Sequence, residues 1–373
     1  MLIGTNTSLW YNGKDIVERC GKQMIYKRRN WRQREQKRKK QRLIACMIAV
    51  AVIILVGILL VMRGCSNNIS GDSNPQVTAT PKAKPTPTVE PTPTPFAFRP
   101  ATGENTEKIS KSIVSKYGIV IDAEDGTILA QRRAKKQMYP ASMTKVLTLL
   151  VAAEHVTDDQ MDDKVTITLD ITDYCYSNDC SAVGFSKNEK VPVKDLFYGT
   201  ILPSGADAAL ALAEYVAGSH EEFVKLMNEK AKELGISESS HFTNCVGIYN
   251  DNHYSTAYDM AIIIKAASEN PICQEVMNAR TYTTTKTKKH KKGILISNWF
   301  LRRIEDHFKT GDILYGKTGF VNQSGNCCAS MAENSEGHTY ICVTGGSTSS
   351  WQCIYDQIDL YAKYCDKIKK TAR

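Results

Sequence analysis

The 373-residue sequence contains none of the short patterns that mark metal, thiol-redox or nucleotide sites. No Cys-x-x-Cys pair is present, so neither a zinc knuckle nor a redox motif is supported. Gly-rich phosphate loops are absent, and no local pattern gives a Ser-His-Asp triad. Four histidines that we considered as metal ligands show no ligand spacing: His155, His241, His253 and His290. We therefore expect a function without a metal or a cofactor.

Proline is scarce outside one stretch, since eight of the twelve prolines fall between Pro75 and Pro100. The Thr-Pro-rich run from Thr86 to Pro95 can neither pair into a sheet nor continue a helix. Fully extended at about 3.1 Å per residue, residues 66–100 would reach on the order of 100 Å. We interpret residues 63–106 as an extracytoplasmic linker between an anchor and one globular domain.

Charge is absent from a run of twenty residues, Leu43–Met62. At about 1.5 Å per residue this run can cross a membrane. Ten Lys or Arg and one Glu lie between Lys27 and Arg42, and their +9 equals the net charge of the whole chain, so nucleic-acid binding is disfavoured. Because positive residues stay inside, we predict a cytoplasmic tail at 1–42, a single transmembrane helix at 43–62 and an extracytoplasmic remainder at the cell membrane. A cleaved signal peptide and a lipoprotein modified at Cys65 are alternatives that fit the flanking residues poorly.

Cysteine usage does not suggest a closed set of disulfides, because an odd number, nine of the twelve, follows the linker. We expect most of these residues to be small buried hydrophobes, and only Cys175 with Cys180 is a candidate for a local disulfide. The nine are Cys175, Cys180, Cys245, Cys273, Cys327, Cys328, Cys342, Cys353 and Cys365.

The pattern with the most chemical content is Ser142-Met143-Thr144-Lys145, which precedes the apolar run 146–150. If this segment is helical, residues three apart share a face, so the amine can reach the hydroxyl. A serine hydroxyl needs a base to become a good nucleophile, and a lysine is that base only if its pKa falls from about 10.4 toward neutrality. Alone, the pattern also fits two residues on a solvated helix face.

Two later segments supply a context for this pattern. Ser204-Gly205 and Lys317-Thr318-Gly319 follow it in the order Ser-x-x-Lys, Ser-x-Asn, Lys-Thr-Gly. With these motifs the sequence resembles the serine D-alanyl-D-alanine carboxypeptidases, the low-molecular-mass penicillin-binding proteins of peptidase family S11. The resemblance covers roughly residues 107–370, and it also includes the segments 119–129, 202–209, 253–259 and 315–325.

The resemblance implies an α+β fold of the β-lactamase and DD-peptidase (transpeptidase) type, with the catalytic domain at 107–373 and the site between an antiparallel sheet and a helical subdomain. Period-two runs predict strands at 117–130, 313–321 and 339–344. Helical patterns predict helices at 142–154, 206–217, 221–234, 256–268 and 351–369. We expect no further domain after the catalytic one.

The resemblance also implies catalytic roles. Ser142 would be the acylated nucleophile and Lys145 its proton acceptor, while Ser204 would pass a proton toward the leaving amine. Lys317 near Lys145 would lower the pKa of the latter, since like charges disfavour a second proton.

The third motif would bind substrate. Lys317 and the hydroxyl of Thr318 would hold the terminal carboxylate, with Gly319 and Phe320 continuing the substrate-binding strand. The backbone N–H groups of Ser142 and Phe320 would form the oxyanion hole.

Three features complicate this assignment. Ala206 stands where the family pattern usually has Asn, so one amide is missing from the second motif. Ser177-Asn178-Asp179 offers an Asn, but we interpret that stretch as a loop outside the motif. Lys309-Thr310-Gly311 is a second copy of the third motif, which we assign to a turn because Asp312 follows it.

The lysine-rich segment Lys286–Lys292 is expected to be a solvated hairpin tip, with contact to anionic wall polymers as the alternative.

The implied function is that of a membrane-anchored serine D-Ala-D-Ala carboxypeptidase that trims peptidoglycan stem peptides and is inhibited by β-lactams. A class A-like β-lactamase is one alternative, but its Glu-x-x-Leu-Asn loop is missing, because the comparable stretch is Glu238–Phe242. A catalytically weakened wall-binding module, with Ala206 as a trace of decay, is the other.

Overall fold

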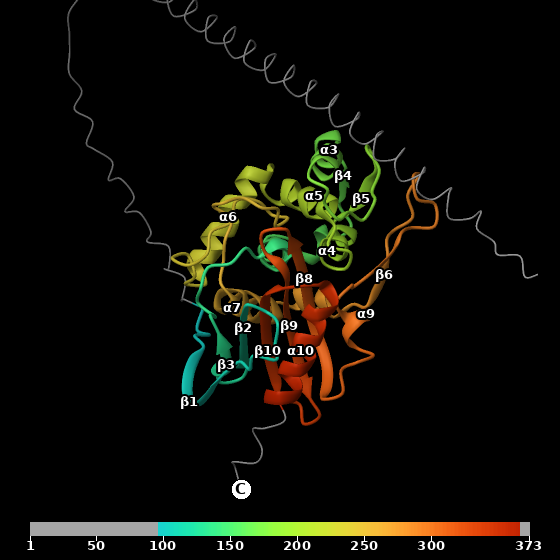
Figure 1. Cartoon of the computed structure of the whole chain (residues 1–373). Coiled ribbons are helices and arrows are strands. Elements are labelled where there is room, and N and C mark those ends of the chain that lie inside the picture. Colours follow the sequence, from blue (N-terminus) through green and yellow to red (C-terminus); the bar gives the residue numbers. More distant parts are fainter. Residues whose placement is uncertain (1–95, 366–373) are drawn as a thin grey trace, which may run out of the picture. The chain divides into compact units, whose positions relative to one another are not determined.

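The structure of the protein is a computed structural model that describes residues 96–365 (Figure 1). The predicted cytoplasmic tail, the predicted transmembrane helix at 43–62 and most of the predicted linker lie outside these residues. Within 96–365, no helix combines the length and the apolar character that a membrane span requires.

A six-stranded sheet forms one side of the described chain, in the order β1-β3-β2-β10-β9-β8. All neighbouring pairs are antiparallel except β1 and β3, which are parallel. The strands are β1 (Ala101–Lys108), β2 (Tyr117–Asp122), β3 (Thr127–Arg132), β8 (Gly311–Val321), β9 (Gly325–Asn334) and β10 (Thr339–Ser347). The predicted strands at 117–130, 313–321 and 339–344 are thus confirmed, with a turn at 123–126. Pairing starts earlier than expected, because β1 begins at Ala101, inside the segment assigned to the linker.

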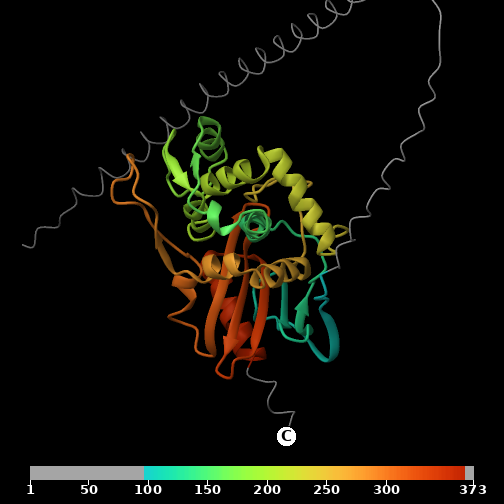
Figure 2. The same ribbon diagram turned by 180° about the vertical axis from the view of Figure 1, so that it is seen from behind.

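The sheet has a hydrophobic core on each face. Along β2, Ile119 and Ile121 belong to the larger core and Val120 belongs to the smaller one, as the alternation of side chains in a strand requires. Helix α7 (Ala257–Ser268) packs on the first face and α10 (Ser350–Tyr364) on the second, and the two views from opposite sides show them on opposite faces (Figures 1 and 2). Thr256 and Ser349 cap these helices by accepting a backbone N–H with their side chains.

A helical subdomain adjoins the larger core. Its central helix is α2 (Thr144–Ala153), all ten residues of which are buried because other helices surround it. Helix α7 and the helices α4 (Val193–Ile201), α5 (Ala206–Ala217), α6 (His220–Glu233) and α8 (Pro271–Asn278) contact α2, and α3 (Leu169–Ser177) packs on α5. The predicted helix at 206–217 has the observed bounds, and those at 142–154, 221–234 and 256–268 shift by one or two residues.

Short elements complete the described chain. They are the 3₁₀ turns η1 (Ala141–Met143) and η2 (Asp158–Gln160), the helix α9 (Leu301–Ile304), and two small two-stranded sheets, β4 (Lys164–Thr166) with β5 (Lys190–Pro192) and β6 (Thr281–Thr283) with β7 (Leu295–Ser297).

Eight of the nine cysteines that follow the linker are buried, as expected for small hydrophobes. Cys175 and Cys180 are both free thiols, so the candidate local disulfide is absent from the structure.

Candidate active site

Ser142 lies in the 3₁₀ turn η1, which leads directly into α2. The preceding residue, Ala141, has a φ of 47°, a left-handed conformation that is unfavourable for alanine. Two glycines allow neighbouring backbone to approach this turn. A β-carbon on Gly247 would lie 1.9 Å from the Ala141 carbonyl oxygen, and one on Gly319 would lie 2.9 Å from the Ser142 nitrogen. The turn is therefore held tightly between the loop at 243–248 and strand β8.

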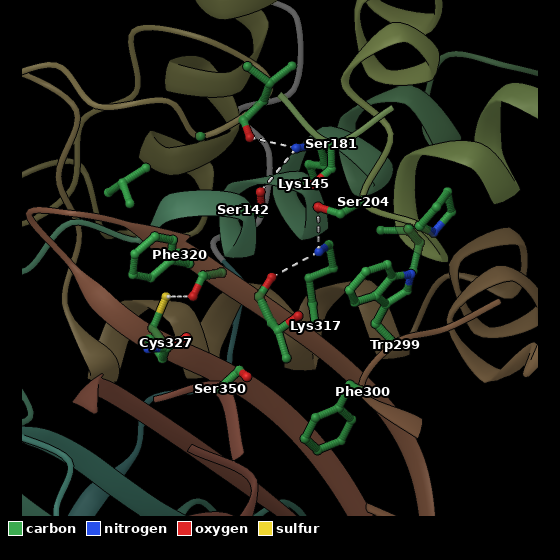
Figure 3. A pocket seen from close by; sticks show the side chains of 18 of the residues that line it. Ser142, Lys145, Ser181, Ser204, Trp299, Phe300, Lys317, Phe320, Cys327 and Ser350 are labelled. Carbon is green, nitrogen blue, oxygen red and sulfur yellow. Dashed lines mark hydrogen bonds between the residues drawn. The ribbon is translucent and has the colours of Figure 1, made fainter. Parts of the chain in front are cut away.

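Lys145 lies one turn further along, on the face of the helix that carries Ser142. Its Nζ donates hydrogen bonds to the Ser142 Oγ at 3.2 Å and to the Val246 carbonyl oxygen at 2.7 Å (Figure 3). The side chain is buried, and burial lowers the pKa of Lys145 to about 8. A substantial fraction of Lys145 is thus an uncharged amine at mildly alkaline pH, able to accept the proton of the hydroxyl beside it.

Lys317 and Ser204 form a second lysine–serine pair. The Lys317 Nζ donates to the Ser204 Oγ at 2.8 Å and to the Thr318 carbonyl oxygen at 2.9 Å. Ser204 has a φ of 62°, so each serine lies at or directly after a left-handed residue. Burial is the main cause, and the charge of Lys145 the second cause, that lowers the pKa of Lys317 to about 7. The expected like-charge effect is therefore seen at Lys317, whereas burial is the cause of the low pKa of Lys145.

These side chains face one pocket of about 430 Å³ between β8 and the helical subdomain (Figure 3). Phe320 and Trp299, which are 58% and 55% exposed, lie on opposite sides of it in the close-up. All seven residues predicted for the site line this pocket: Ser142, Lys145, Ser204, Lys317, Thr318, Gly319 and Phe320. The second Lys-Thr-Gly copy, at 309–311, is not part of the lining and lies where β8 begins.

We interpreted residues 177–179 as a loop outside the second motif, but in the structure they form the end of a helix at the pocket. Ser177 is the last residue of helix α3, and Asn178 caps it by donating from Nδ2 to the Tyr174 carbonyl oxygen at 2.9 Å. Asn178 and Asp179 both line the pocket. Apolar periodicity is weak in α3, so the capping residue Thr168 was the available signal for this helix.

Ala206, which lacks the amide expected in the second motif, lies close to this segment in the fold. Ala206 is the first residue of α5 and is fully buried, and its N–H donates to the Ser181 carbonyl oxygen at 2.8 Å. The next residue, Asp207, accepts from the backbone N–H groups of Val183 and Gly184 at 2.8 and 3.0 Å. The start of α5 thus fixes the segment that follows Asn178 against the pocket.

The loop at 243–248 contains a buried group that sequence reasoning missed. The Oδ1 of Asn244 accepts hydrogen bonds from the N–H groups of Val246, Gly247 and Ile248 at 3.2, 2.7 and 3.1 Å. These bonds shape the turn from which the Val246 carbonyl reaches Lys145. Asn244 is therefore a positioning residue for the amine.

His253 holds the same loop to α2. Burial lowers the pKa of His253 to about 3, so the ring is neutral at physiological pH. Its Nδ1 accepts from the Thr243 N–H at 3.1 Å, so Nε2 carries the hydrogen and donates to the Thr144 Oγ1 at 2.8 Å. A neutral histidine with no contact to Ser142 supports the helix rather than acting as a base.

Comparisons with known proteins agree with this geometry. The sequence model of the family described as D-alanyl-D-alanine carboxypeptidase matches residues 103–348. The chain is 37% identical to the carboxypeptidase DacF of Bacillus subtilis over 173 residues, which are 46% of this chain and 43% of that protein. It is 34% identical to DacC of Escherichia coli over 224 residues, 58% of this chain and 55% of that protein. The chain thus spans about half the length of these curated relatives.

Solved structures show the same likeness. A Streptomyces DD-transpeptidase superposes with a TM-score of 0.62 at 28% identity, over 68% of this chain and 98% of that one. Penicillin-binding protein 5 of Haemophilus influenzae gives a TM-score of 0.62 at 28% identity, over 68% of this chain and 72% of that one. The predicted α+β fold of the DD-peptidase type is confirmed.

Proposed function

The chain belongs to the D-alanyl-D-alanine carboxypeptidase family of serine peptidases, and from this we propose that it removes the terminal D-alanine of peptidoglycan stem peptides through an acyl-enzyme on Ser142. One observation carries the proposal. A buried lysine amine with a lowered pKa lies 3.2 Å from the Ser142 hydroxyl, in the same pocket as a second buried lysine that can bind a carboxylate.

In the proposed acylation, Lys145 takes the proton of Ser142 as the Oγ attacks the carbonyl carbon of the penultimate residue. The Val246 carbonyl accepts one N–H of the amine, which leaves its lone pair free to face the Ser142 hydroxyl. Negative charge develops on the carbonyl oxygen, which in this proposal accepts hydrogen bonds from the N–H groups of Ser142 and Phe320. The bond to the terminal D-alanine then breaks, which leaves the ester on Ser142.

The second lysine–serine pair serves binding and protonation of the leaving group. The carboxylate of the terminal D-alanine lies against Lys317 and Thr318, and this negative charge raises the pKa of Lys317 and keeps it an ammonium. Ser204, which accepts from Lys317, passes its proton to the departing amine and receives in exchange the proton that Lys145 took from Ser142, so Lys145 is neutral again. Water then attacks the ester as Lys145 takes a proton from it, and Lys145 returns this proton to the Ser142 Oγ as the ester bond breaks.

We also place the catalytic region outside the cytoplasmic membrane. The support is in the sequence, where the charge-free run Leu43–Met62 follows a strongly basic segment and precedes a Pro/Thr-rich stretch. Peptidoglycan is extracytoplasmic, so a tether of this kind would hold the enzyme beside its substrate.

A labelled penicillin tests the proposal, because it acylates the same hydroxyl. We expect the full chain to become stably labelled and the Ser142→Ala variant to remain unlabelled. Ser350→Ala is the matched control, since Ser350 lines the pocket but lies outside both lysine–serine pairs. D-Alanine release from a pentapeptide should follow the same pattern.

Three results count against the proposal. Rapid release of hydrolysed penicillin indicates a β-lactamase, and no labelling of the unmodified chain indicates a binding module. Labelling without D-alanine release contradicts the carboxypeptidase activity.

A further inference from the structure

A lysine-rich tip ends a two-stranded arm, which we define as residues 281–297. Strands β6 and β7 form its base, and the chain between them projects away from the six-stranded sheet and runs beside the two-stranded sheet of β4 and β5 (Figures 1 and 2). The tip, residues 286–292, holds five exposed lysines. None of the five forms an ion pair with a carboxylate within residues 96–365.

A buried carboxylate of the helical subdomain holds the base of the arm. Asp195, in α4, accepts from the Tyr282 hydroxyl at 2.7 Å and from the Thr285 N–H at 2.7 Å. The ring of Tyr282 also stacks on that of Tyr198, with centroids 3.9 Å apart. Hydrogen bonds to a buried carboxylate are among the stronger ones in proteins, so the base has a defined position.

A second buried carboxylate holds the tip itself. Glu189, just before β5, accepts from the Thr287 hydroxyl and from His290 Nδ1, the latter at 2.8 Å. The tip also closes a turn of its own, in which the Thr287 N–H donates to the His290 carbonyl oxygen at 3.0 Å. Both carboxylates accept hydrogen bonds from hydroxyl, amide and imidazole groups of the arm, and neither forms an ion pair with a lysine of the tip.

The five ammonium groups repel one another, and this repulsion opposes their confinement in one ordered turn. A merely solvated tip would need neither Asp195 nor Glu189. We propose that the tip binds a linear polymer of phosphate esters outside the membrane, which brings the enzyme to the wall. This inference rests on the proposed function only for the location of the arm.

The composition of the tip favours a polymer over a lipid bilayer. Residues 286–292 contain no apolar side chain that could enter the headgroup region. Lysine ammonium groups bind phosphates as point charges without demanding one geometry, which suits a flexible chain with repeated charges. Binding would release counterions, so it would weaken steeply as salt rises.

The test compares three forms of the full chain in phosphatidylcholine nanodiscs, with immobilised inorganic polyphosphate as the probe. The arm variant carries Gln at the five lysines of the tip. The control variant carries Gln at five exposed lysines elsewhere: Lys108, Lys111, Lys116, Lys136 and Lys232. The arm variant should lose about tenfold or more in affinity at low ionic strength and show a shallower salt dependence, and the control should stay within about twofold of the unmodified chain. The basic segment at 27–42 is common to all three.

Other results decide the remaining questions. Glu189→Gln keeps every lysine and should lose affinity by a smaller factor, because the tip is less well held. Equal losses in the arm and control variants, or no loss in the arm variant, overturn the proposal. Loss of binding to phosphatidylglycerol vesicles with polyphosphate binding intact overturns the choice of a polymer. D-Alanine release from a soluble pentapeptide is measured on the same samples, so failure of the proposed function is seen separately.

Discussion

The pocket and the arm use lysine in opposite ways. In the pocket, Lys145 and Lys317 are 2% and 4% exposed, each donates to a serine hydroxyl, and burial lowers the pKa of both. In the arm, five lysines are exposed and lack carboxylate partners within the described residues 96–365. The same side chain is thus fitted for proton transfer where water is excluded and for electrostatic attraction where water is abundant.

The largest expected effect separates the two regions directly. Lys145→Met keeps the buried volume but removes the amine beside Ser142, so acylation by labelled penicillin should slow by about a thousandfold, within the range for loss of a general base. Lys289→Met removes one lysine of the arm and should leave acylation unchanged. Single-turnover labelling measures both rates, and thermal unfolding checks that both variants fold. If Lys145→Met labels within tenfold of the unmodified chain, another group is the base.

Two glycines offer a matched test of backbone geometry in the two regions. Gly247 and Gly293 have φ values of 81° and 73°, and a β-carbon on either would come within about 2 Å of a carbonyl oxygen, at 1.9 Å for the first and 2.1 Å for the second. Gly247→Ala should displace the Ala141–Ser142 turn and slow acylation about a hundredfold, because an ångström of misplacement can cost that much. Gly293→Ala strains the arm equally and should leave acylation unchanged.

Labelling rates and unfolding midpoints in urea are compared for these two alanine variants. A similar fall in acylation for both would mean that the effect is global destabilisation rather than displacement of the nucleophile.

The pH dependence of acylation follows from the buried lysines, whereas that of stability also depends on the buried cysteines. The proposed acylation requires a neutral Lys145, whose pKa is lowered to about 8 by burial, so at saturating penicillin, whose carboxylate keeps Lys317 charged, the rate should rise about tenfold per pH unit up to that value and then level off. Stability should rise with pH from about 7 to 8, where the two buried lysines hold more protons in the unfolded chain than in the folded one. It should fall above about pH 9, because burial raises the pKa of seven cysteine thiols, which then keep their protons only in the folded chain. The five-lysine arm variant should show the same two curves. An acylation rate that is flat from pH 6 to 8 would falsify the proposed role of Lys145.

The sequence predicted the pocket better than its surroundings. The seven predicted residues come together because the three motifs occupy the start of α2, the start of α5 and strand β8, elements whose periodicity the sequence shows clearly. Strand β9 was missed because six consecutive residues, 327–332, are buried on both faces, so the period-two alternation is absent. Strand β1 was missed for the opposite reason, since almost all of its residues are exposed at the sheet edge.

The supporting residues of the pocket could not be predicted from local patterns. Asn244 and His253 act through hydrogen bonds to backbone and to Thr144, more than a hundred positions away in the case of His253. Nothing in a single sequence marks an Asn as the acceptor of three successive N–H groups. Likewise, the cause of the low pKa of Lys145 is burial by surrounding helices, which only the packing reveals.

The smallest expected effect concerns Asn178, at the edge of the pocket. Its Nδ2 already donates to Tyr174, which leaves its Oδ1 and one N–H to meet substrate near the place where Ala206 lacks an amide. Asn178→Ala should therefore weaken binding by about 1 kcal/mol, seen as a roughly fivefold rise in KM for a pentapeptide with little change in kcat. Ser177→Ala is the control, because Ser177 lies in the same helix, also bonds the carbonyl four residues earlier and lies outside the lining. Equal effects of the two substitutions on KM would show that Asn178 only caps its helix, and the amide missing at Ala206 would then have no substitute at this position.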